Sequence, residues 1–365
     1  MGPMKALHQL DPKRFETPNI LRGLSAASRQ LAELKGVASS IPNQGILINS
    51  LGLQEAKDSS AIENIVTTHD ELFRNAVFPA AVASAAAKEV ARYGQALHIG
   101  WKAVVQQQLL TNKTILRVQQ ELEGNDAGFR KLPGTNLKTD SGAVVYTPPQ
   151  DHREILDLME DLERFINDDD VFAADPLVKM ALIHYQFESI HPFYDGNGRT
   201  GRIICVLYLV KTGLLEIPVL YLSRHIVRTK SEYYRLLQRV RDTDDWESWV
   251  VYLLTAVEVT AKQGITTVNA IKDLLLKVKH RIRANYPKVY SQDLVNNLFT
   301  HPYTKIDFLR RDLGVTRLTA TKYLDALVAG GVLKKQKVGR SNYYVNEPLV
   351  QILTGEAMRD GVPGL

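Results

Sequence analysis

The sequence predicts a mainly α-helical protein with one small β-hairpin and a C-terminal winged helix-turn-helix. Apolar residues recur at three- and four-residue spacing through most of the chain, which is typical of amphipathic helices. Residues 130–149 instead combine glycine and proline with a short β-branched run, which predicts a hairpin. After Pro287 the pattern changes to three short helical segments followed by a basic stretch around Gly339.

Composition indicates an ordinary globular protein. A chain of 365 residues with 45% hydrophobic and 23% charged residues predicts two or three domains. Cys205 is the single cysteine, so a disulfide framework is excluded and the side chain is expected to serve packing. The net charge of +5 permits a nucleic-acid partner without requiring one. No signal-peptide pattern opens the chain, and the alanine-rich run 80–87 is too short to span a bilayer, so we expect a cytoplasmic protein without membrane contact.

The helices of the first half follow from periodicity and from helix-breaking residues. The first is expected to end near Gly36, and the second to begin at Asn49 or Ser50. Asp175 and Pro176 form a typical cap and first residue for a later helix. The expected helices up to residue 283 are 20–34, 51–64, 71–78, 84–104, 115–122, 155–166, 176–190, 203–211, 222–240, 246–254 and 255–283.

The last eighty residues predict a winged helix-turn-helix. Helices are expected at 291–299, 305–313 and 316–329, with a β-wing at 332–345 that turns at Gly339. In such a module the third helix would present Arg317, Thr319, Thr321 and Lys322 to a DNA major groove, and the wing would present Lys335, Lys337 and Arg340 to phosphates. The alternative use is protein docking or formation of a homodimer.

The most informative stretch is residues 191–202, His-Pro-Phe-Tyr-Asp-Gly-Asn-Gly-Arg-Thr-Gly-Arg. Gly196, Asn197 and Gly198 can turn successive backbone N–H groups inward at the start of an apolar helix, which predicts an anion-binding nest. Arg199 and Arg202 lie three residues apart, so both guanidinium groups reach one side of that helix. The spacing is that of a phosphate site, although it is not a Walker loop.

Two further side chains in this stretch indicate chemistry. Asp195 offers a hard oxygen beside the phosphates, as a Mg²⁺ ion that keeps most of its waters needs. His191 lies just before the turn and can accept a proton near neutral pH. Together they predict a nucleoside polyphosphate held next to a general base.

Residues 191–202 match, without departure, the motif H-P-F-x-[DE]-G-N-G-R-x-x-R, so the chain is identified as resembling the Fic family. The resemblance implies a Fic-type helical core that uses ATP as substrate and Mg²⁺ on Asp195. It also implies that residues 196–202, including Thr200 and Gly201, bind the nucleotide. The domains expected are an N-terminal helical region at 1–110, a catalytic core at 111–284 and the winged helix-turn-helix at 285–365.

A second motif lies at the end of the helix expected at about 50–65. Ser59 and Glu63 are four residues apart and share a helix face, which by itself is compatible with a solvated surface glutamate. Beside the Fic motif, Ser59, Glu63 and Asn64 resemble the family's inhibitory pattern [ST]-x-x-x-E-[GN]. The resemblance implies that Glu63 pairs with Arg202 and fills the γ-phosphate position, where its charge would repel ATP.

The hairpin and one tyrosine complete the expected site. Residues 128–130 and Pro148-Pro149 resemble the limits of the family's flap, which adds a strand of the target protein by backbone pairing. The alternative is a plain connecting hairpin. Tyr233 lies where family members line the adenine pocket, although helix core is an equal interpretation. His184 is expected to be a structural histidine.

The resemblance implies a protein adenylyltransferase that transfers AMP from ATP to a Tyr, Ser or Thr hydroxyl of a target protein or of the chain itself. Some relatives remove AMP instead, with the inhibitory glutamate orienting a water. A phosphorylating branch departs from the motif at the glycine that is intact here as Gly198, and another branch transfers phosphocholine. From a different class, the chain could be an ATP-sensing transcriptional regulator.

Overall fold

The computed structural model describes residues 6–78, 84–139 and 141–355, and these are mainly helical, as the sequence predicts. The alanine-rich run 80–87 lies partly outside the described residues. No helix in the described parts of the chain combines the length and apolarity needed to cross a membrane.

The N-terminal helices form where caps and periodicity place them. Thr17 and Ser84 accept hydrogen bonds from the backbone N–H groups of Ile20 and Ala87, and so cap the first and fourth helices. The first helix runs beyond Gly36, and the second begins at Gly45, earlier than expected. The elements are η1 (Leu7–Gln9), η2 (Pro12–Phe15), α1 (Pro18–Ser39), α2 (Gly45–Ile62), α3 (His69–Val77), α4 (Ala85–Gln107) and α5 (Asn112–Glu123).

The middle of the chain contains the hairpin and the motif. Strands β1 (Leu137–Lys138) and β2 (Val144–Tyr146) pair in antiparallel register, Leu137 opposite Tyr146, so the predicted hairpin is present. The helices α6 (His152–Asn167), α7 (Pro176–Ile190) and α8 (Asn197–Lys211) follow. Nearly all side chains of α7 and α8 are buried, which explains why neither helix shows an amphipathic pattern.

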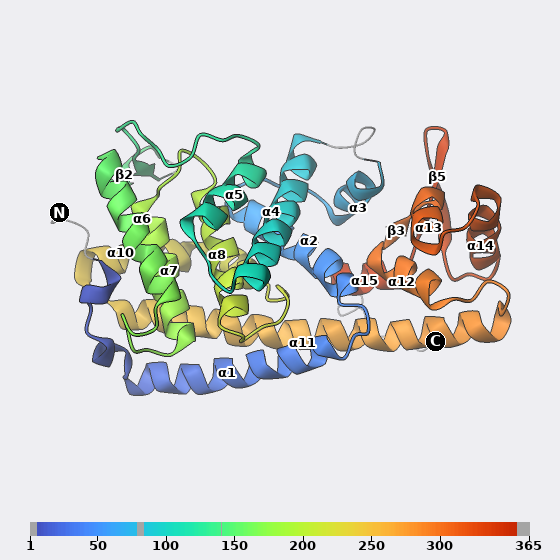
Figure 1. Cartoon of the computed structure of the whole chain (residues 1–365), viewed down its shortest axis with the longest axis horizontal. Coiled ribbons are helices and arrows are strands. Elements are labelled where there is room, and N and C mark those ends of the chain that lie inside the picture. Colours follow the sequence, from blue (N-terminus) through green and yellow to red (C-terminus); the bar gives the residue numbers. More distant parts are fainter. Residues whose placement is uncertain (1–5, 79–83, 140, 356–365) are drawn as a thin grey trace.

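Two connections between helices also differ from the prediction. The segment 222–240 is not one helix, because Thr229 leaves helical geometry at φ −123° between α9 (Leu222–Arg228) and α10 (Lys230–Thr243). Conversely, the two helices expected at 246–254 and 255–283 form one helix, α11 (Trp246–Asn285). Figure 1 shows α11 running along the whole molecule, with α1 beside it.

The C-terminal region, defined here as residues 286–355, contains the three predicted helices and the predicted wing. These are α12 (Gln292–Thr300), α13 (Ile306–Leu313), α14 (Arg317–Ala329), β4 (Lys334–Val338) and β5 (Ser341–Val345). The prediction missed β3 (Tyr303–Thr304), which pairs with β5 in the sheet order β3-β5-β4, and α15 (Glu347–Thr354). A two-residue strand carries too little pattern to be recognised in a sequence.

The C-terminal region packs directly on the N-terminal helices. The Gln54 side chain of α2 donates a hydrogen bond to the carbonyl of Leu353 in α15. The Tyr303 hydroxyl donates to Asp70 at 2.7 Å, and Lys305 donates to the carbonyl of Val77 at 2.6 Å. Helix α2 is therefore held between α4 on one side and the C-terminal region on the other.

Candidate active site

The motif residues form the tight connection between α7 and α8. His191 ends α7 in a left-handed conformation, φ 50° and ψ 56°, and its N–H donates to the carbonyl of Phe187. Asn197 closes the loop, since its side-chain amide accepts from the N–H of Phe193 and donates to the carbonyl of the same residue. The loop is thus fixed by its own side chain before any ligand binds.

The backbone of the nest differs in one respect from the expectation. Of Gly196, Asn197 and Gly198, only Gly196 has a positive φ, 77°, and it precedes the first residue of α8. Asn197 and Gly198 already belong to the first turn of the helix, whose leading N–H groups have no partner within the helix. The anion-binding capacity therefore belongs to a helix N-terminus preceded by one left-handed glycine.

Arg202 lies against the end of α2, as the second motif implies. Its Nη2 donates to Oε1 of Glu63 at 2.8 Å and to the carbonyl of Ser59, while its Nε donates to the Ser59 hydroxyl at 2.8 Å. Arg202 is buried, whereas about a third of the Glu63 side chain is exposed (34%). Burial pushes the pKa of Glu63 up, but the charge and hydrogen bond of Arg202 outweigh it and hold that pKa below its ordinary value.

The carboxylate of Glu63 lies directly over the start of α8. A β carbon added at Gly198 would collide with Oε1 of Glu63 and lie 3.0 Å from Nη1 of Arg202. Asn64 follows in a left-handed conformation, φ 64°, and ends α2 so that the N–H of Ile65 bonds to the carbonyl of Ser60. Asparagine and glycine tolerate this conformation best, which explains physically why either follows the glutamate.

Arg199 is held by two carboxylates that the sequence analysis missed. Its Nη1 donates to Glu89 of α4 at 2.5 Å, and its Nη2 donates to Glu123, the last residue of α5, at 3.0 Å. Oε1 of Glu123 also lies where a β carbon of Gly196 would be. The only sequence signal was an acidic residue at the end of a helix that faces the core, which is too common to single out.

His191 is half-buried at the end of α7. Burial and the nearby charge of Arg130 lower the pKa of His191 to about 4, so its imidazole is neutral at physiological pH. A neutral imidazole is the form that can accept a proton. The residue therefore has the protonation state that a general base needs.

Arg130 joins the base of the hairpin to the motif loop. It is fully buried, its Nε donates to the carbonyl of His191 at 2.8 Å, and its backbone N–H donates to the carbonyl of Pro192. Its Nη2 donates to the carbonyl of Pro149 at the far end of the hairpin. One guanidinium group thus fixes both ends of residues 130–149 relative to His191.

Asp195 presents an exposed carboxylate beside the nest, and its Oδ1 accepts from the N–H of Gly196 at 2.7 Å. No group of three or more potential ligands of the His, Cys, Asp or Glu type gathers among the described residues. Mg²⁺ in nucleotide sites is usually held by one or two carboxylates together with substrate phosphates and waters. A single exposed carboxylate at the mouth of an anion nest fits that kind of ion.

The remaining predicted residues lie deeper. Thr200 is buried, and Gly201 lets α8 approach α7, because a β carbon there would lie 2.8 Å from Oε1 of Glu188. Tyr233 is buried in the core, where its hydroxyl lies 2.8 Å from Nε2 of His184. His184 is a buried structural histidine, as expected. A contact of Tyr233 with adenine stays a prediction.

Glu188 is a second buried acid that the sequence analysis did not select. Its Oε1 has no hydrogen-bond partner among the described residues. Burial raises the pKa of Glu188 to about 7, although Arg202 opposes the shift. The residue lies one turn before His191 and beside Arg202, so its protonation affects the charge balance of the site.

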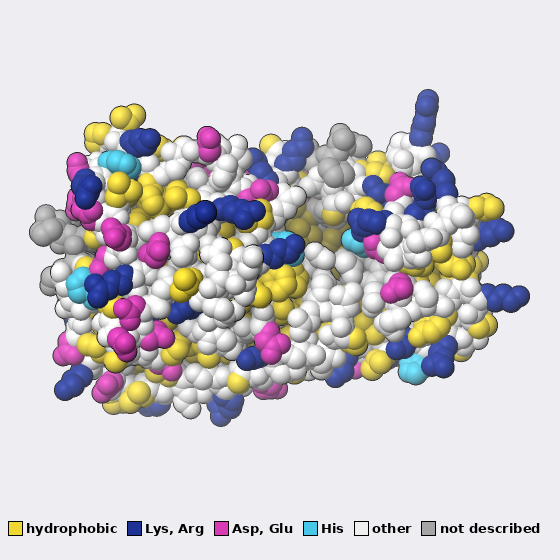
Figure 2. Space-filling model, viewed as in Figure 1, with side chains coloured by type: hydrophobic (Ala, Val, Ile, Leu, Met, Phe, Trp, Pro, Cys, Tyr) yellow, Lys and Arg dark blue, Asp and Glu magenta, His cyan; other side chains and the backbone are white. Residues whose placement is uncertain are grey.

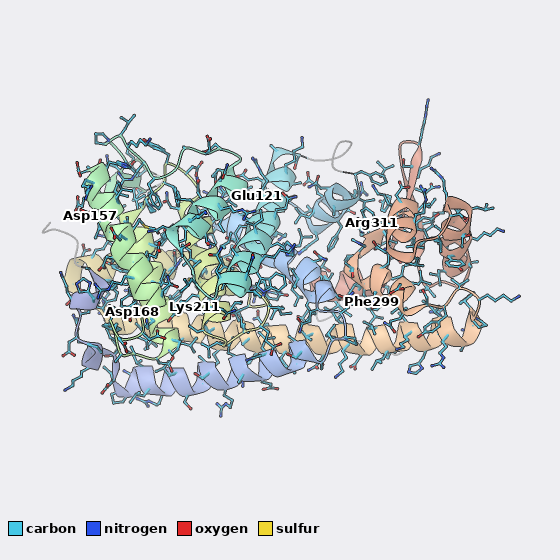
Figure 3. The ribbon with its side chains drawn as sticks, viewed as in Figure 1. Glu121, Asp157, Asp168, Lys211, Phe299 and Arg311 are labelled. Atoms are coloured by element: carbon cyan, nitrogen blue, oxygen red, sulfur yellow. The ribbon has the colours of Figure 1, made fainter. Side chains whose placement is uncertain are left out.

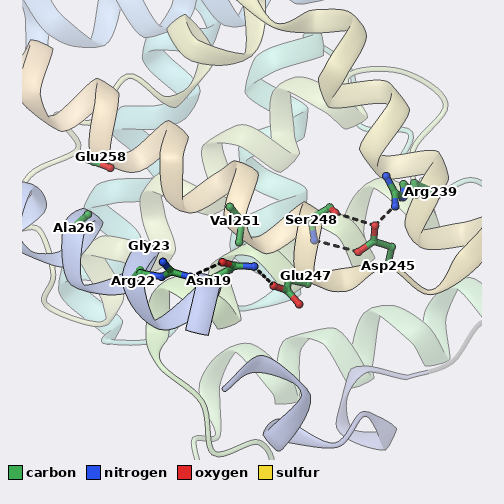
Figure 4. Close-up of a pocket in the computed structure, with 10 residues that line it drawn as sticks. All are labelled: Asn19, Arg22, Gly23, Ala26, Arg239, Asp245, Glu247, Ser248, Val251 and Glu258. Carbon is green, nitrogen blue, oxygen red and sulfur yellow. Dashed lines mark hydrogen bonds and ion pairs between the residues drawn. The ribbon is translucent and has the colours of Figure 1, made fainter. Parts of the chain in front are cut away.

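A surface cavity elsewhere, about 600 Å³, lies between α1 and α11 and contains none of the motif residues. Figure 4 shows two pairs among its polar side chains, Asn19 with Glu247 and Arg239 with Asp245. No residue of the anion nest lines this cavity, so we do not assign the phosphate site to it.

Sequence profiles place the chain in a family. Residues 21–102 match the Fic/DOC family N-terminal region, and residues 109–209 match the Fic/DOC family domain. Residues 274–349 match the C-terminal domain of SoFic-like protein adenylyltransferases. The chain belongs to the Fic/DOC family.

Among curated proteins, protein adenylyltransferase fic-1 of Caenorhabditis elegans is 29% identical over 162 residues, which is 44% of this chain and 30% of the relative. Protein adenylyltransferase Fic of Drosophila erecta is 28% identical over 142 residues, 39% of this chain and 27% of the relative. The matched part thus spans less than a third of the length of these relatives.

Solved structures show the same fold. A Fic family protein from Desulfovibrio desulfuricans superposes with a TM-score of 0.57 at 20% identity, covering 90% of this chain and 96% of the other. Fic-1 from Caenorhabditis elegans superposes with a TM-score of 0.54 at 21% identity, covering 69% and 74%. The first of these superpositions thus extends over nearly the whole chain.

Proposed function

We propose that this protein is a protein adenylyltransferase, which transfers AMP from ATP to a hydroxyl group of a target protein. The observation that carries the proposal is the junction of α7 and α8. There a neutral, half-buried His191 adjoins a helix N-terminus that has two arginines in its first two turns. The similarity to named adenylyltransferases supports the same reaction.

In the proposed reaction His191 accepts the proton of a Tyr, Ser or Thr hydroxyl, and the hydroxyl oxygen attacks the α-phosphorus of ATP. Pyrophosphate leaves, and the N–H groups at the start of α8 together with Arg199 and Arg202 bind its negative charge. Asp195 would hold Mg²⁺, which when bound neutralises phosphate charge. The chain contributes positioning and charge stabilisation rather than a covalent intermediate.

The proposed resting state is autoinhibited, because carboxylates cover both ends of the phosphate site. Glu63 lies over Gly198 and bonds to Arg202, and Glu123 lies over Gly196 and bonds to Arg199. A triphosphate has to replace at least the Glu63 contact before Arg202 can bind the γ-phosphate. Glu63 could alternatively orient a water that removes AMP, and a chase experiment with labelled target would measure that activity.

The hairpin is the proposed docking place of the target. Val144 is 54% exposed and Leu132 is 68% exposed, so apolar side chains of residues 130–149 are open to solvent, and Arg130 ties this segment to the carbonyl of His191. A target strand that pairs with this edge would present its hydroxyl with little sequence requirement. The target is another protein or this chain itself.

Incubation with ATP labelled on either the α- or the γ-phosphate tests the proposal. AMP transfer predicts that protein-bound label appears only with α-labelled ATP and requires His191. Label from γ-labelled ATP alone would indicate phosphorylation and overturn the proposal. Absence of label from both nucleotides, even with the Glu63→Gly variant and added cell extract as target source, would also overturn it.

We also propose the domain limits near 110 and 285 that the sequence predicts. A second candidate function, DNA binding, rests on the exposed basic side chains of the C-terminal region. Lys334 and Lys335 are neutralised by Glu347 and Asp325, whereas Arg317, Lys322, Lys337 and Arg340 make no ion pair with other described residues. Figure 2 shows Lys and Arg side chains gathered at this end of the molecule.

Salt-dependent retention on duplex DNA tests this second function. Replacing Lys337 and Arg340 with alanine is expected to lower the slope of log affinity against log salt by about one unit for each lost phosphate contact. An unchanged slope would favour protein docking or a homodimer as the role of this region.

A further inference from the structure

A cavity of about 740 Å³ lies between α2, α4 and the C-terminal region, away from the motif loop. Its walls include Leu53 of α2, Phe73 of α3, Leu97 of α4, and Tyr303 and Phe308 of the C-terminal region. Figure 2 shows hydrophobic side chains lining the recess between the helical body and this region. The volume is that of a small-molecule site, roughly 300–1,000 Å³.

Two glycines in helix interiors give this cavity its space. Gly52 of α2 and Gly94 of α4 both line it, and a β carbon at either position would meet no atom within 4 Å. A glycine inside a helix costs about 1 kcal/mol relative to alanine. No neighbouring side chain fills the space beside either glycine, so this space forms part of the cavity.

The lining indicates what kind of molecule fits. Aromatic rings form one side, with Phe73 and Tyr303 centred 5.3 Å apart and His301 and Phe308 4.6 Å apart. The side-chain amides of Asn49 and Gln95 lie at the solvent-exposed rim of the cavity, and neither makes a hydrogen bond to another residue that the structure describes. Flat aromatic walls with a few free amides favour a flat, mainly apolar ligand that carries a polar atom.

The charges at the rim favour a neutral ligand. Glu121 of α5 and Arg311 of α13 lie on opposite sides of the cavity (Figure 3). Nε of Arg311 is already bonded to Asp312 at 2.7 Å, whereas Glu121 makes no ion pair with another described residue. Glu121 would repel an anion and Arg311 would repel a cation, and no other Asp, Glu, Lys or Arg is among the described lining residues, so a neutral ligand fits best.

We propose that this cavity is a binding site for a neutral, planar aromatic small molecule, held between the aromatic rings and oriented by the amides of Asn49 and Gln95. The ligand would contact the helix that carries Glu63. Gly52 and Ser59 are seven residues apart, so they share one face of α2, and Gly52 precedes Glu63 by about 16 Å along the helix axis. The site itself does not depend on the reaction proposed above.

The test uses N-phenyl-1-naphthylamine, a neutral aromatic amine that fluoresces in apolar surroundings, with the full chain. We expect saturable binding of one molecule per chain, and hydrogen-exchange protection on binding within residues 48–53 and 91–99. The Gly94→Leu variant fills the cavity and is expected to weaken binding at least about tenfold, since each lost 1.4 kcal/mol of contact costs that factor. Gly36→Leu is the matched control, because Gly36 is exposed on α1 and also has open space around its α carbon.

Thermal melting identifies a Gly94→Leu protein that fails to fold, and the smaller Gly52→Ala change then replaces it, with a several-fold weaker affinity expected. Binding that is unsaturable in the wild-type chain would overturn the proposal. So would a lack of protection in both segments, or equal affinity in a folded Gly94→Leu variant and the wild-type chain.

Discussion

Replacing Glu63 with glycine is expected to accelerate AMP transfer about ten- to a hundredfold. The carboxylate accepts a charge-assisted hydrogen bond of 2.8 Å from a buried guanidinium group, and such a bond is worth about 1.5–3 kcal/mol. Each 1.36 kcal/mol removed from the barrier is a factor of ten in rate. Because about a third of the Glu63 side chain is exposed, solvent screening places the effect in the lower part of the range.

The assay follows label transfer from α-labelled ATP at equal nucleotide concentration. Glu258→Gly is the matched control, because Glu258 forms a 2.5 Å pair with Lys262 on the surface of α11 and lies outside the site. ADP affinity should change much less than ATP affinity, since ADP has no γ-phosphate to meet Arg202. Equal transfer rates for Glu63→Gly and Glu258→Gly would refute the inhibitory role and leave Glu63 an ordinary helix-end carboxylate.

Three further outcomes are expected. Asp195→Ala should lose activity that added Mg²⁺ restores little, because the ligand itself is removed; an unchanged Mg²⁺ dependence would exclude Asp195 from the site. Glu123→Gln should weaken the hold on Arg199 and raise ATP affinity several-fold, measured by calorimetry, whereas unchanged affinity would make the pair purely structural. The pKa of Glu188 is about 7 in the folded chain against 4.5 ordinarily, so the folded state binds the extra proton between these values and stability falls as pH rises through that window. Melting temperatures of Glu188→Gln should therefore decline less between pH 5 and 7.5 than those of the wild-type chain, while Glu55, whose pKa burial also raises to about 7, contributes equally in both proteins.

Local signals predicted most of the helices and the pieces of the candidate site. Capping residues such as Ser84, Asp175 and Thr316 mark helix starts through bonds within three residues, so they can be read directly from the sequence. The break at Thr229 could not be predicted, because neither glycine nor proline marks it and tertiary packing decides the geometry.

Contacts between side chains far apart in the sequence were predicted only where the family motifs include both residues. The contact of Glu63 with Arg202 joins residues 139 apart and was expected only from the family pattern. The contacts of Arg199 with Glu89 and Glu123 join residues 110 and 76 apart, and no spacing rule selects those two acids among the chain's 40. Which carboxylate meets which arginine is decided by how α2, α4 and α5 pack on α8.

The most direct measurement is transfer from α-labelled ATP by Glu63→Gly with and without a second change, His191→Ala. The central claim is that His191 removes the target proton in a phosphate site that Glu63 otherwise covers. The double variant should bind ATP as tightly as Glu63→Gly but transfer AMP about 10²–10⁴ times more slowly, the usual contribution of a general base. His280→Ala, a change at an exposed position of α11, should leave the rate of Glu63→Gly unaltered. Undiminished label in the Glu63→Gly, His191→Ala protein would contradict the claim.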